Sequence, residues 1–277
     1  KIIYKTKAQD VAAKNKALEE VQGKYILVMN GDMCLEKTAL EKLFNAEEKN
    51  NTDIAICGYN IIDLNTNQLI HEGINNKFKE VEELNGKNEN FAYLNLDGGN
   101  KLIKRDIAKD IKFQNYDDCQ DEIFILSCYA KANKISFVNE QLYYKYEDNS
   151  NKNLKNQIQI KDLKNGLVEV KKLYKDAGKY EKMKNMLSFI AFTRIGMRAL
   201  IELTVNKSGD LKDNIRDIMN YLDVNFFEWR KNPFLKLKNV PKKRYWLAYT
   251  MYKYGFQQLF IKIYSKPIEK GNRLLVI

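Results

Sequence analysis

The chain has 277 residues, of which 44% are hydrophobic and 30% are charged. This composition is typical of a globular protein and is too apolar for a disordered one. The single histidine, His71, excludes any mechanism that needs two imidazole groups. The four cysteines show neither a C-x-x-C pair nor zinc-like spacing, a pattern typical of reduced intracellular thiols.

Charge is distributed unevenly along the chain. Residues 1–150 carry a net charge of −5, whereas residues 151–277 carry +16. Two regions of opposite charge indicate two different roles. The acidic half is suited to metal-binding and catalytic carboxylates. The basic half is suited to an anionic partner, either phospholipid or nucleic acid.

The first 150 residues alternate helical and strand patterns. Helices are expected over residues 10–23 and 36–50, and from the carboxylates at 117–122 to Ala132. Apolar runs predict strands at residues 2–4, 25–29, 53–59, 135–138 and 142–146, with a short hairpin around 65–68. This alternation predicts an α/β domain with a mostly parallel sheet flanked by helices.

The polar run from Asn149 to Asn153 marks the expected boundary between two domains, 1–150 and 151–277. Beyond it, apolar residues recur at helical spacing over residues 154–174, 183–203, 211–227 and 245–264. The C-terminal region is therefore predicted to be all-α and basic.

Two carboxylate motifs in the first half are candidates for chemistry. Asp32 ends the sequence Asn30-Gly31-Asp32, directly after the most apolar strand, where open α/β sheets bind ligands. An Asp there can hold Mg²⁺ or Mn²⁺ beside substrate phosphates, but the same tripeptide is also ordinary turn chemistry. The cluster of Asp117, Asp118, Asp121 and Glu122 offers a general base. It equally fits the N-terminus of a helix, where carboxylates are favoured.

A third candidate is basic and aromatic. Five cations cluster at Lys236, Lys238, Lys242, Lys243 and Arg244, and six aromatic residues follow between Tyr245 and Phe256. This mixture is suited to an anionic membrane interface or to a nucleic-acid surface. A packed helix with a solvated lysine face explains it as well, and no nucleic-acid motif is present.

The order of several short motifs resembles that of a bacterial family 2 glycosyltransferase. Five segments carry the resemblance: residues 11–18, residues 23–32 ending in Asn-Gly-Asp, Lys101-Leu102-Ile103-Lys104-Arg105, Gln120-Asp121-Glu122-Ile123-Phe124, and Tyr143-Tyr144-Lys145-Tyr146 with Ser150. The helical tail is similar to that of enzymes that make capsular, exopolysaccharide or teichoic-type polymers.

The resemblance implies a GT-A fold and an inverting transfer of one sugar from a nucleotide-sugar. Asp32 would hold the Mg²⁺ or Mn²⁺, and Asp121 would take the proton from the acceptor hydroxyl, with Glu122 in reserve. The donor side would comprise Lys14, Asn15, Asn30, Gly31 and Asp32. Gly99, Asn100 and Lys101 would form the acceptor side, with Asn100 near a place where relatives often have Trp.

The resemblance also implies partners and a location. The acceptor would be a glycan, carried on a lipid. The protein would be cytoplasmic and peripheral on the inner face of the cell membrane, with no nucleic-acid partner. Because the chain begins at what would be the third strand, roughly 50 residues of a first βαβ unit are expected to be absent, and the chain alone is expected to bind donor poorly. The alternative is a non-catalytic α/β domain whose basic helical module binds an anionic membrane or nucleic acid.

Overall fold

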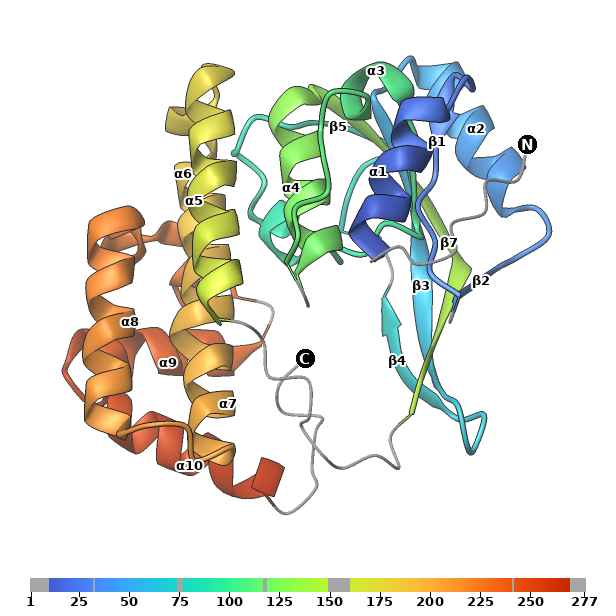
Figure 1. Ribbon diagram of the computed structural model, residues 1–277. Coiled ribbons are helices and arrows are strands. Elements are labelled where there is room, and N and C mark those ends of the chain that lie inside the picture. Colours follow the sequence, from blue (N-terminus) through green and yellow to red (C-terminus); the bar gives the residue numbers. More distant parts are fainter. Residues whose placement is uncertain are drawn as a thin grey trace. The chain divides into compact units, whose positions relative to one another are not determined.

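A computed structural model describes residues 10–31, 33–73, 77–116, 119–148, 160–240 and 242–269 (Figure 1). The chain forms two compact units, residues 1–85 with 94–151, and residues 86–93 with 152–277. The segment 86–93 therefore packs with the helical unit, although the sequence pattern places it in the first domain. The boundary expected at residue 150 and the strand expected at residues 2–4 lie outside the described residues.

The first unit is built on one mixed sheet. Its strands are β1 (Tyr25–Ile26), β2 (Met33–Leu35), β3 (Ile54–Asp63), β4 (Leu69–Gly73), β5 (Val81–Glu83), β6 (Lys101–Lys104) and β7 (Lys134–Glu147). They are arranged in the order β1-β6-β3-β7-β2, and β4 and β5 pair with β3 and β7 respectively. The α/β class is confirmed.

The expected parallel character of the sheet is wrong for the described residues. Only β3 and β7 run parallel there, and every other described pairing is antiparallel. A parallel pair needs a long crossover connection, usually a helix. β3 and β7 have such a connection through α4 (Gln120–Lys131), whereas β6 is reached through an irregular segment and a short 3₁₀ turn.

Helices cover both faces of this sheet. Ala39 and Leu43 of α2 (Ala39–Asn50) pack with Ala55 and Cys57 of β3 in one buried cluster. Figure 1 shows α4 on the other side of β3 and β7, and residues 123–130 of α4 are all buried. With both faces covered, β3 reads as a continuous apolar run rather than an alternating one. Two shorter helices, α1 (Asp10–Glu20) and α3 (Arg105–Ala108), complete the unit.

The two strands expected at residues 135–138 and 142–146 form one strand, β7. In the register with β3, Val138 pairs with Cys57 and Gln141 pairs with Gly58, so two extra residues bulge out of β7. A Cβ at Gly58 would lie 2.9 Å from the carbonyl oxygen of Glu140, so the bulge needs glycine opposite it. The polar residues Asn139 and Glu140, which separate the two apolar runs in the sequence, form this bulge.

The second unit is helical, as the sequence predicts. Its elements are η1 (Glu89–Tyr93), α5 (Ile160–Asp176), α6 (Tyr180–Ala191), the π-helical η2 (Phe192–Ala199), α7 (Leu200–Val205), α8 (Leu211–Asn225), η3 (Phe227–Lys231), η4 (Pro233–Leu235), α9 (Lys243–Lys253) and α10 (Gln257–Glu269). The helix expected over 245–264 is two helices, because Gly255 adopts a φ of +82° between them. No described helix is both long and apolar enough to span a bilayer.

Aromatic side chains form the core of the helical unit. Trp229 is fully buried and stacks on Phe192, with ring centroids 5.3 Å apart. Tyr252 meets Phe192 edge to face at 5.3 Å, and it also contacts Phe260 of α10 at 5.8 Å. Large buried rings of this kind account for much of the stability of a small helical unit. They also fix α10 to the rest of it.

Candidate functional site

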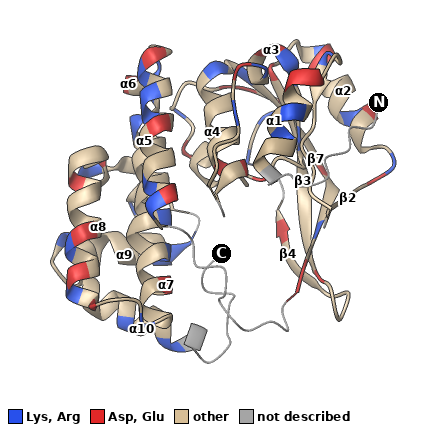
Figure 2. Cartoon of the chain, viewed as in Figure 1, with Lys and Arg blue, Asp and Glu red and all other residues tan. Residues whose placement is uncertain are grey.

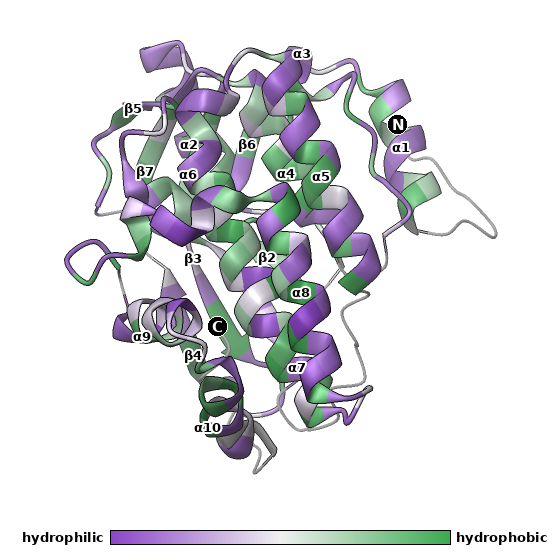
Figure 3. Ribbon diagram, turned by 90° about the vertical axis from the view of Figure 1, so that its left-hand side faces the viewer, coloured by the Kyte–Doolittle hydropathy of each residue, from purple (hydrophilic) through white to green (hydrophobic). Residues whose placement is uncertain are grey.

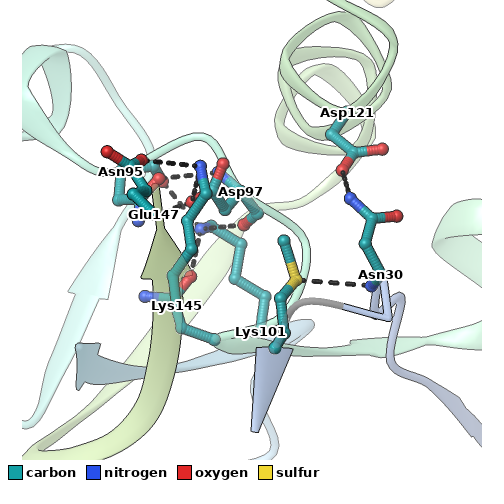
Figure 4. A network of polar contacts seen from close by, with 9 residues as sticks. Asn30, Asn95, Asp97, Lys101, Asp121, Lys145 and Glu147 are labelled. Carbon is teal, nitrogen blue, oxygen red and sulfur yellow. Dashed lines mark hydrogen bonds and ion pairs between the residues drawn. The ribbon is translucent and has the colours of Figure 1, made fainter. Parts of the chain in front are cut away.

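Three polar side chains from distant parts of the sequence meet at the N-terminus of α4. The Lys14 ammonium lies 3.0 Å from Oδ1 of Asp121. The Asn30 amide donates to Oδ2 of the same carboxylate at 3.3 Å, a contact drawn in Figure 4. Lys14 and Asp121 are 107 residues apart in the chain, and their side chains are 13% and 19% exposed. The carboxylate is thus held from both oxygens yet remains open to solvent.

Each of these three residues is positioned by a different element. Lys14 lies on α1, Asn30 follows the short strand β1, and Asp121 occupies the first turn of α4. A carboxylate in the first turn of a helix interacts favourably with the helix dipole. Both interpretations of the acidic cluster at 117–122 are therefore compatible, although Asp117 and Asp118 lie outside the described residues.

Asn15 acts through the backbone of Phe113. Its amide donates to the Phe113 carbonyl and accepts from the Phe113 N–H, both at 2.8 Å. The Phe113 ring lies 5.3 Å from the Lys14 ammonium and stacks on Phe124 of α4 at 4.1 Å. Asn15 therefore ties α1 to the helix that carries Asp121. The sequence analysis missed Phe113, which no motif marks.

The metal ligand expected from the sequence, Asp32, lies outside the described residues. Its neighbour Gly31 is exposed, and a Cβ added there would meet no atom within 4 Å. The Asn30 backbone N–H donates to the Met33 sulfur at 3.3 Å. Asn30, two residues before Asp32, is therefore the part of this segment that is described in contact with Asp121.

Glu122, the reserve base, follows Asp121 in the same helical turn. One of its carboxylate oxygens is shielded from solvent. The side-chain oxygen of its neighbour Gln120 is buried as well. Asp121 is the member of this turn for which the contacts with Lys14 and Asn30 are described.

The residues expected on the acceptor side are buried. Asn100 is 2% and Lys101 is 0% exposed, and the Lys101 ammonium donates to the carbonyls of Asn95 and Asp97 and to the Asn100 side chain at 2.6–2.7 Å (Figure 4). Asn100 in turn donates to the Cys57 carbonyl at 2.8 Å. A contact between an acceptor and either side chain would require these bonds to break. In this structure the two residues fix the segment before β6.

Burial changes the acid–base behaviour of this segment. Loss of hydration lowers the pKa of Lys101 from 10.5 to about 8, although the nearby Asp97 carboxylate opposes the shift. Gly99 is buried too, with the Tyr143 ring 2.3 Å from where a Cβ would lie. The Gly-Gly-Asn-Lys segment is therefore best interpreted as a place where the backbone packs closely against neighbouring side chains.

The sequence analysis did not identify Lys145, a cation near this segment, as a candidate site residue. Lys145 of β7 lies 3.6 Å from Asp97 and 3.4 Å from Glu147 (Figure 4). Its side chain is 25% exposed, so it is accessible from solvent. Figure 4 shows the ion pairs of Lys145 beside the Lys101 network, with the Asp121–Asn30 pair nearby.

The expected divalent metal needs a group of ligands that can be sought among the described residues. No three His, Cys, Asp or Glu side chains come together within the described ranges. Both oxygens of Asp121 are occupied by nitrogen donors, an arrangement suited to holding a carboxylate rather than to ligating a cation. These residues therefore do not make a metal site on their own, and the metal hypothesis depends on Asp32.

The arrangement can perform proton transfer. A carboxylate anchored through one oxygen by a lysine and contacted more weakly at the other can accept a proton from a hydroxyl group placed at the second oxygen. The 3.3 Å contact from Asn30 is at the long end for a hydrogen bond. Oδ2 is therefore the atom at which a hydroxyl group can most readily take the place of a protein donor.

Comparison with sequence families gives a match to the model "Glycosyl transferase family 2" over residues 1–112. Among curated proteins, the chain is 30% identical over 151 residues to a cholesterol galactosyltransferase of Borreliella burgdorferi, an alignment that covers 49% of this chain and 41% of that protein. It is 25% identical over 144 residues to glycosyltransferase GlyG of Streptococcus pneumoniae, covering 47% and 46% respectively. The alignments thus span less than half the length of these relatives.

Comparison with solved structures shows the fold. The chain is similar to S. aureus TarS in complex with UDP-GlcNAc, with a TM-score of 0.63 and 15% sequence identity, covering 93% of this chain and 71% of TarS residues 1–349. The TarS complex with UDP gives a TM-score of 0.57 at 16% identity, covering 94% and 71%. The expected GT-A-like architecture with a helical C-terminal region is confirmed.

Proposed function

We propose that this chain, whose residues 1–112 match the model of glycosyl transferase family 2, transfers a sugar from a nucleotide-sugar to a hydroxyl group, with inversion at the anomeric carbon. The observation that carries the proposal is the convergence of Lys14 and Asn30 on Asp121 from 107 and 91 residues away. Such convergence of charged groups at a solvent-accessible point is typical of a catalytic site.

Asp121 is the proposed general base. The acceptor hydroxyl would donate to Oδ2 in place of Asn30, while Lys14 keeps Oδ1 fixed. The hydroxyl oxygen then attacks the anomeric carbon as its proton passes to the carboxylate, and the nucleoside diphosphate leaves from the opposite face. Positioning by Lys14 and by the Asn15–Phe113 pair keeps the base in line for this attack.

The donor is proposed to be a uridine diphosphate sugar, since TarS, which shares the fold, is described with UDP-GlcNAc. The Lys14 ammonium, within reach of the base, is the cation among the described donor-side residues that can pair with the diphosphate. Asp32 would hold Mg²⁺ or Mn²⁺, which when bound neutralises charge on the leaving diphosphate.

The acceptor is proposed to be a glycan carried on a lipid, used at the inner face of the cell membrane to build a cell-surface polysaccharide. The net charge of +16 on residues 151–277 supports this location, because anionic phospholipids attract cationic surfaces. Nucleic acid is not proposed as a partner.

Sugar transfer from UDP-sugars by the full chain tests the proposal, with Asp121→Asn as the variant. Loss of the base should lower kcat about 100-fold or more, because general bases contribute about 10²–10⁴-fold. Asp106→Asn, which changes an exposed carboxylate of the same unit, should leave kcat unchanged. If Asp121→Asn retains full transfer while its unfolding curve is unaltered, Asp121 is not the base.

A further inference from the structure

The C-terminal helices carry large apolar side chains that are exposed among the described residues of the unit. On α10, Leu259 and Ile263 are 51% and 50% exposed, and Phe256, just before the helix, is 56% exposed. Tyr254, in the turn from α9, is 66% exposed. Phe256, Leu259 and Ile263, here called the apolar stripe, follow the i, i+3, i+7 spacing of one helix face.

α10 is apolar on its inner side as well, so the apolar stripe is not needed to attach it. Phe260 and Ile261 are fully buried, and the Phe260 ring contacts Tyr252 of α9. At about 100° per residue, these buried residues and the apolar stripe occupy different sectors of the helix. The apolar stripe is therefore not required to hold α10 in the unit, which is the behaviour expected of an interaction surface.

Cations border the apolar stripe on one side. Lys262 and Lys266 are exposed on α10, and by helical spacing they flank the stripe on the side away from Phe260. Residues 229–268 contain ten Lys or Arg and no Asp or Glu. Eight of the ten are exposed: Lys231, Lys236, Lys238, Lys242, Lys243, Lys253, Lys262 and Lys266. Figure 2 shows these C-terminal helices with blue turns, and Figure 3 shows the alternation of green and purple along them.

We propose that α10 and the turn before it dock this protein onto an anionic phospholipid bilayer, with the apolar stripe entering the acyl boundary and the lysines contacting lipid phosphates. An exposed apolar face bordered by lysines and aromatic residues is the pattern of helices that lie in the membrane interface. Tyr254 is exposed in the turn before α10, and aromatic rings of this kind favour the headgroup region of a bilayer.

Other occupants fit the surface less well. A second copy of this chain would bring cations against cations, because a two-fold interface pairs a surface with itself. Nucleic acid would use the lysines but would leave Leu259 and Ile263 without an apolar partner. The bilayer satisfies both the charge and the apolar stripe.

The docking surface deepens the proposed function, since it would bring the transferase to a lipid-linked acceptor. The experiment that tests it uses neither donor nor acceptor, so its failure is distinct from a failure of sugar transfer. The full chain is sedimented with vesicles of phosphatidylcholine alone and of phosphatidylcholine mixed with phosphatidylglycerol. Binding is expected only to the anionic vesicles, and it should weaken as salt is raised.

Two double variants separate the apolar and electrostatic contributions. Leu259→Asn with Ile263→Asn, and separately Lys262→Gln with Lys266→Gln, should each weaken binding to anionic vesicles about tenfold. The matched controls are Val224→Asn with Phe227→Asn, which are 71% and 60% exposed elsewhere on the unit, and the exposed pair Lys172→Gln with Lys182→Gln. The controls should bind as the unaltered chain does.

Three results would overturn the proposal. The first is equal binding by the stripe variant and its control. The second is a change of oligomeric state in the stripe variant, measured by sedimentation velocity, with vesicle binding unaffected, which would assign the surface to a second copy. The third is tight binding of an oligonucleotide by the chain without any affinity for anionic vesicles. Unfolding curves of each variant identify any loss that comes from misfolding.

Discussion

At the scale of single residues, Lys14 has two proposed roles in this site. It fixes one oxygen of Asp121, and in the proposed reaction it would also pair with the diphosphate of the donor. Its ammonium lies over the ring of Phe113, whose backbone is held by Asn15. A lysine so placed is a positioning residue for the base, and its loss should affect the chemical step more than the fold.

We expect Lys14→Met, which keeps the length of the stem, to lower kcat about tenfold or more because Asp121 loses its anchor. Removing one member of a partly buried ion pair should also cost about 1–2 kcal/mol of stability. Lys16→Met is the control on the same helix, since Lys16 pairs with Glu19 and Glu20 of that helix, whose side chains are 60% and 31% exposed. Steady-state kinetics and thermal unfolding check both. Unchanged kcat in Lys14→Met would remove Lys14 from the positioning of the base.

Glu47 of α2 is a carboxylate buried away from the site. It is 0% exposed, and neither of its oxygens has a hydrogen-bond partner within the described part of the chain. Burial raises the pKa of Glu47 from 4.5 to about 8, although Lys104 partly offsets the shift. Between these values the folded protein keeps a proton that the unfolded chain has released, so stability falls as pH rises from 4.5 to 8.

We expect Glu47→Gln to weaken this loss of stability. The variant should be more stable than the parent by about 1–3 kcal/mol at pH 8 and little changed near pH 5, because only the charged form is costly to bury. Glu41→Gln, an exposed change on the same helix, provides the control. Urea unfolding at the two pH values checks the difference. A gain of the same size at both would mean that ionisation of Glu47 is not responsible.

At the scale of elements, the site depends on close backbone approaches that short motifs only hint at. Gly99 lies against Tyr143 of β7, and Lys101 ties the preceding segment together from within. The sequence analysis assigned this segment to the acceptor because family motifs give order along the chain but not the direction of side chains. Burial of Asn100 and Lys101 depends on which strands flank β6, and that is a tertiary property.

We expect Gly99→Ala to destabilise the first unit by about 1–3 kcal/mol, since its Cβ would overlap the Tyr143 ring at 2.3 Å. Gly23→Ala is the matched control, because the nearest atom to a Cβ there is 3.4 Å away, an ordinary contact. The midpoint of chemical unfolding measures both. Equal effects of the two changes would show that the packing at Tyr143 relaxes without cost.

Elements were easiest to predict where one physical signal dominates. Helical spacing of apolar residues identified the helices of the C-terminal half, and the continuous apolar run at 53–59 identified β3. The strand predicted from the apolar run at 25–29 is longer than the one observed, since only Tyr25–Ile26 is paired as β1. An apolar run reports burial, whereas strand length depends on how far the antiparallel neighbour β6 extends, and β6 has four residues.

At the scale of the whole molecule, the charge asymmetry of the sequence follows the division into two units. Net charge is a sum over residues and survives any arrangement of the chain, so it could be predicted reliably. The membership of residues 86–93 in the helical unit could not, because it depends on a chain excursion between β5 and β6. Local patterns carry no information on such an excursion.

Through residues 86–93, the helical unit gains contacts with a segment that lies far upstream in the sequence. The ring of Tyr93 meets Phe189 edge to face at 4.8 Å and stacks on Tyr245 at 6.3 Å, and its hydroxyl donates to the Phe234 carbonyl at 3.2 Å. Phe91 of the same turn is 2% exposed. The segment thus contributes both apolar area and a hydrogen bond to a unit whose other residues all follow residue 151.

We expect Tyr93→Ala to destabilise the helical unit by about 1–3 kcal/mol, through lost aromatic packing and one lost hydrogen bond. Hydrogen exchange should therefore accelerate in α6 and α9, while β3 and β7 of the first unit keep their protection, because the two units have separate cores. Tyr254→Ala removes an exposed tyrosine of the same unit and should change neither. Equal acceleration of exchange in β3 and α6 would mean that the units unfold together, and that residues 86–93 stabilise the molecule as one cooperative whole.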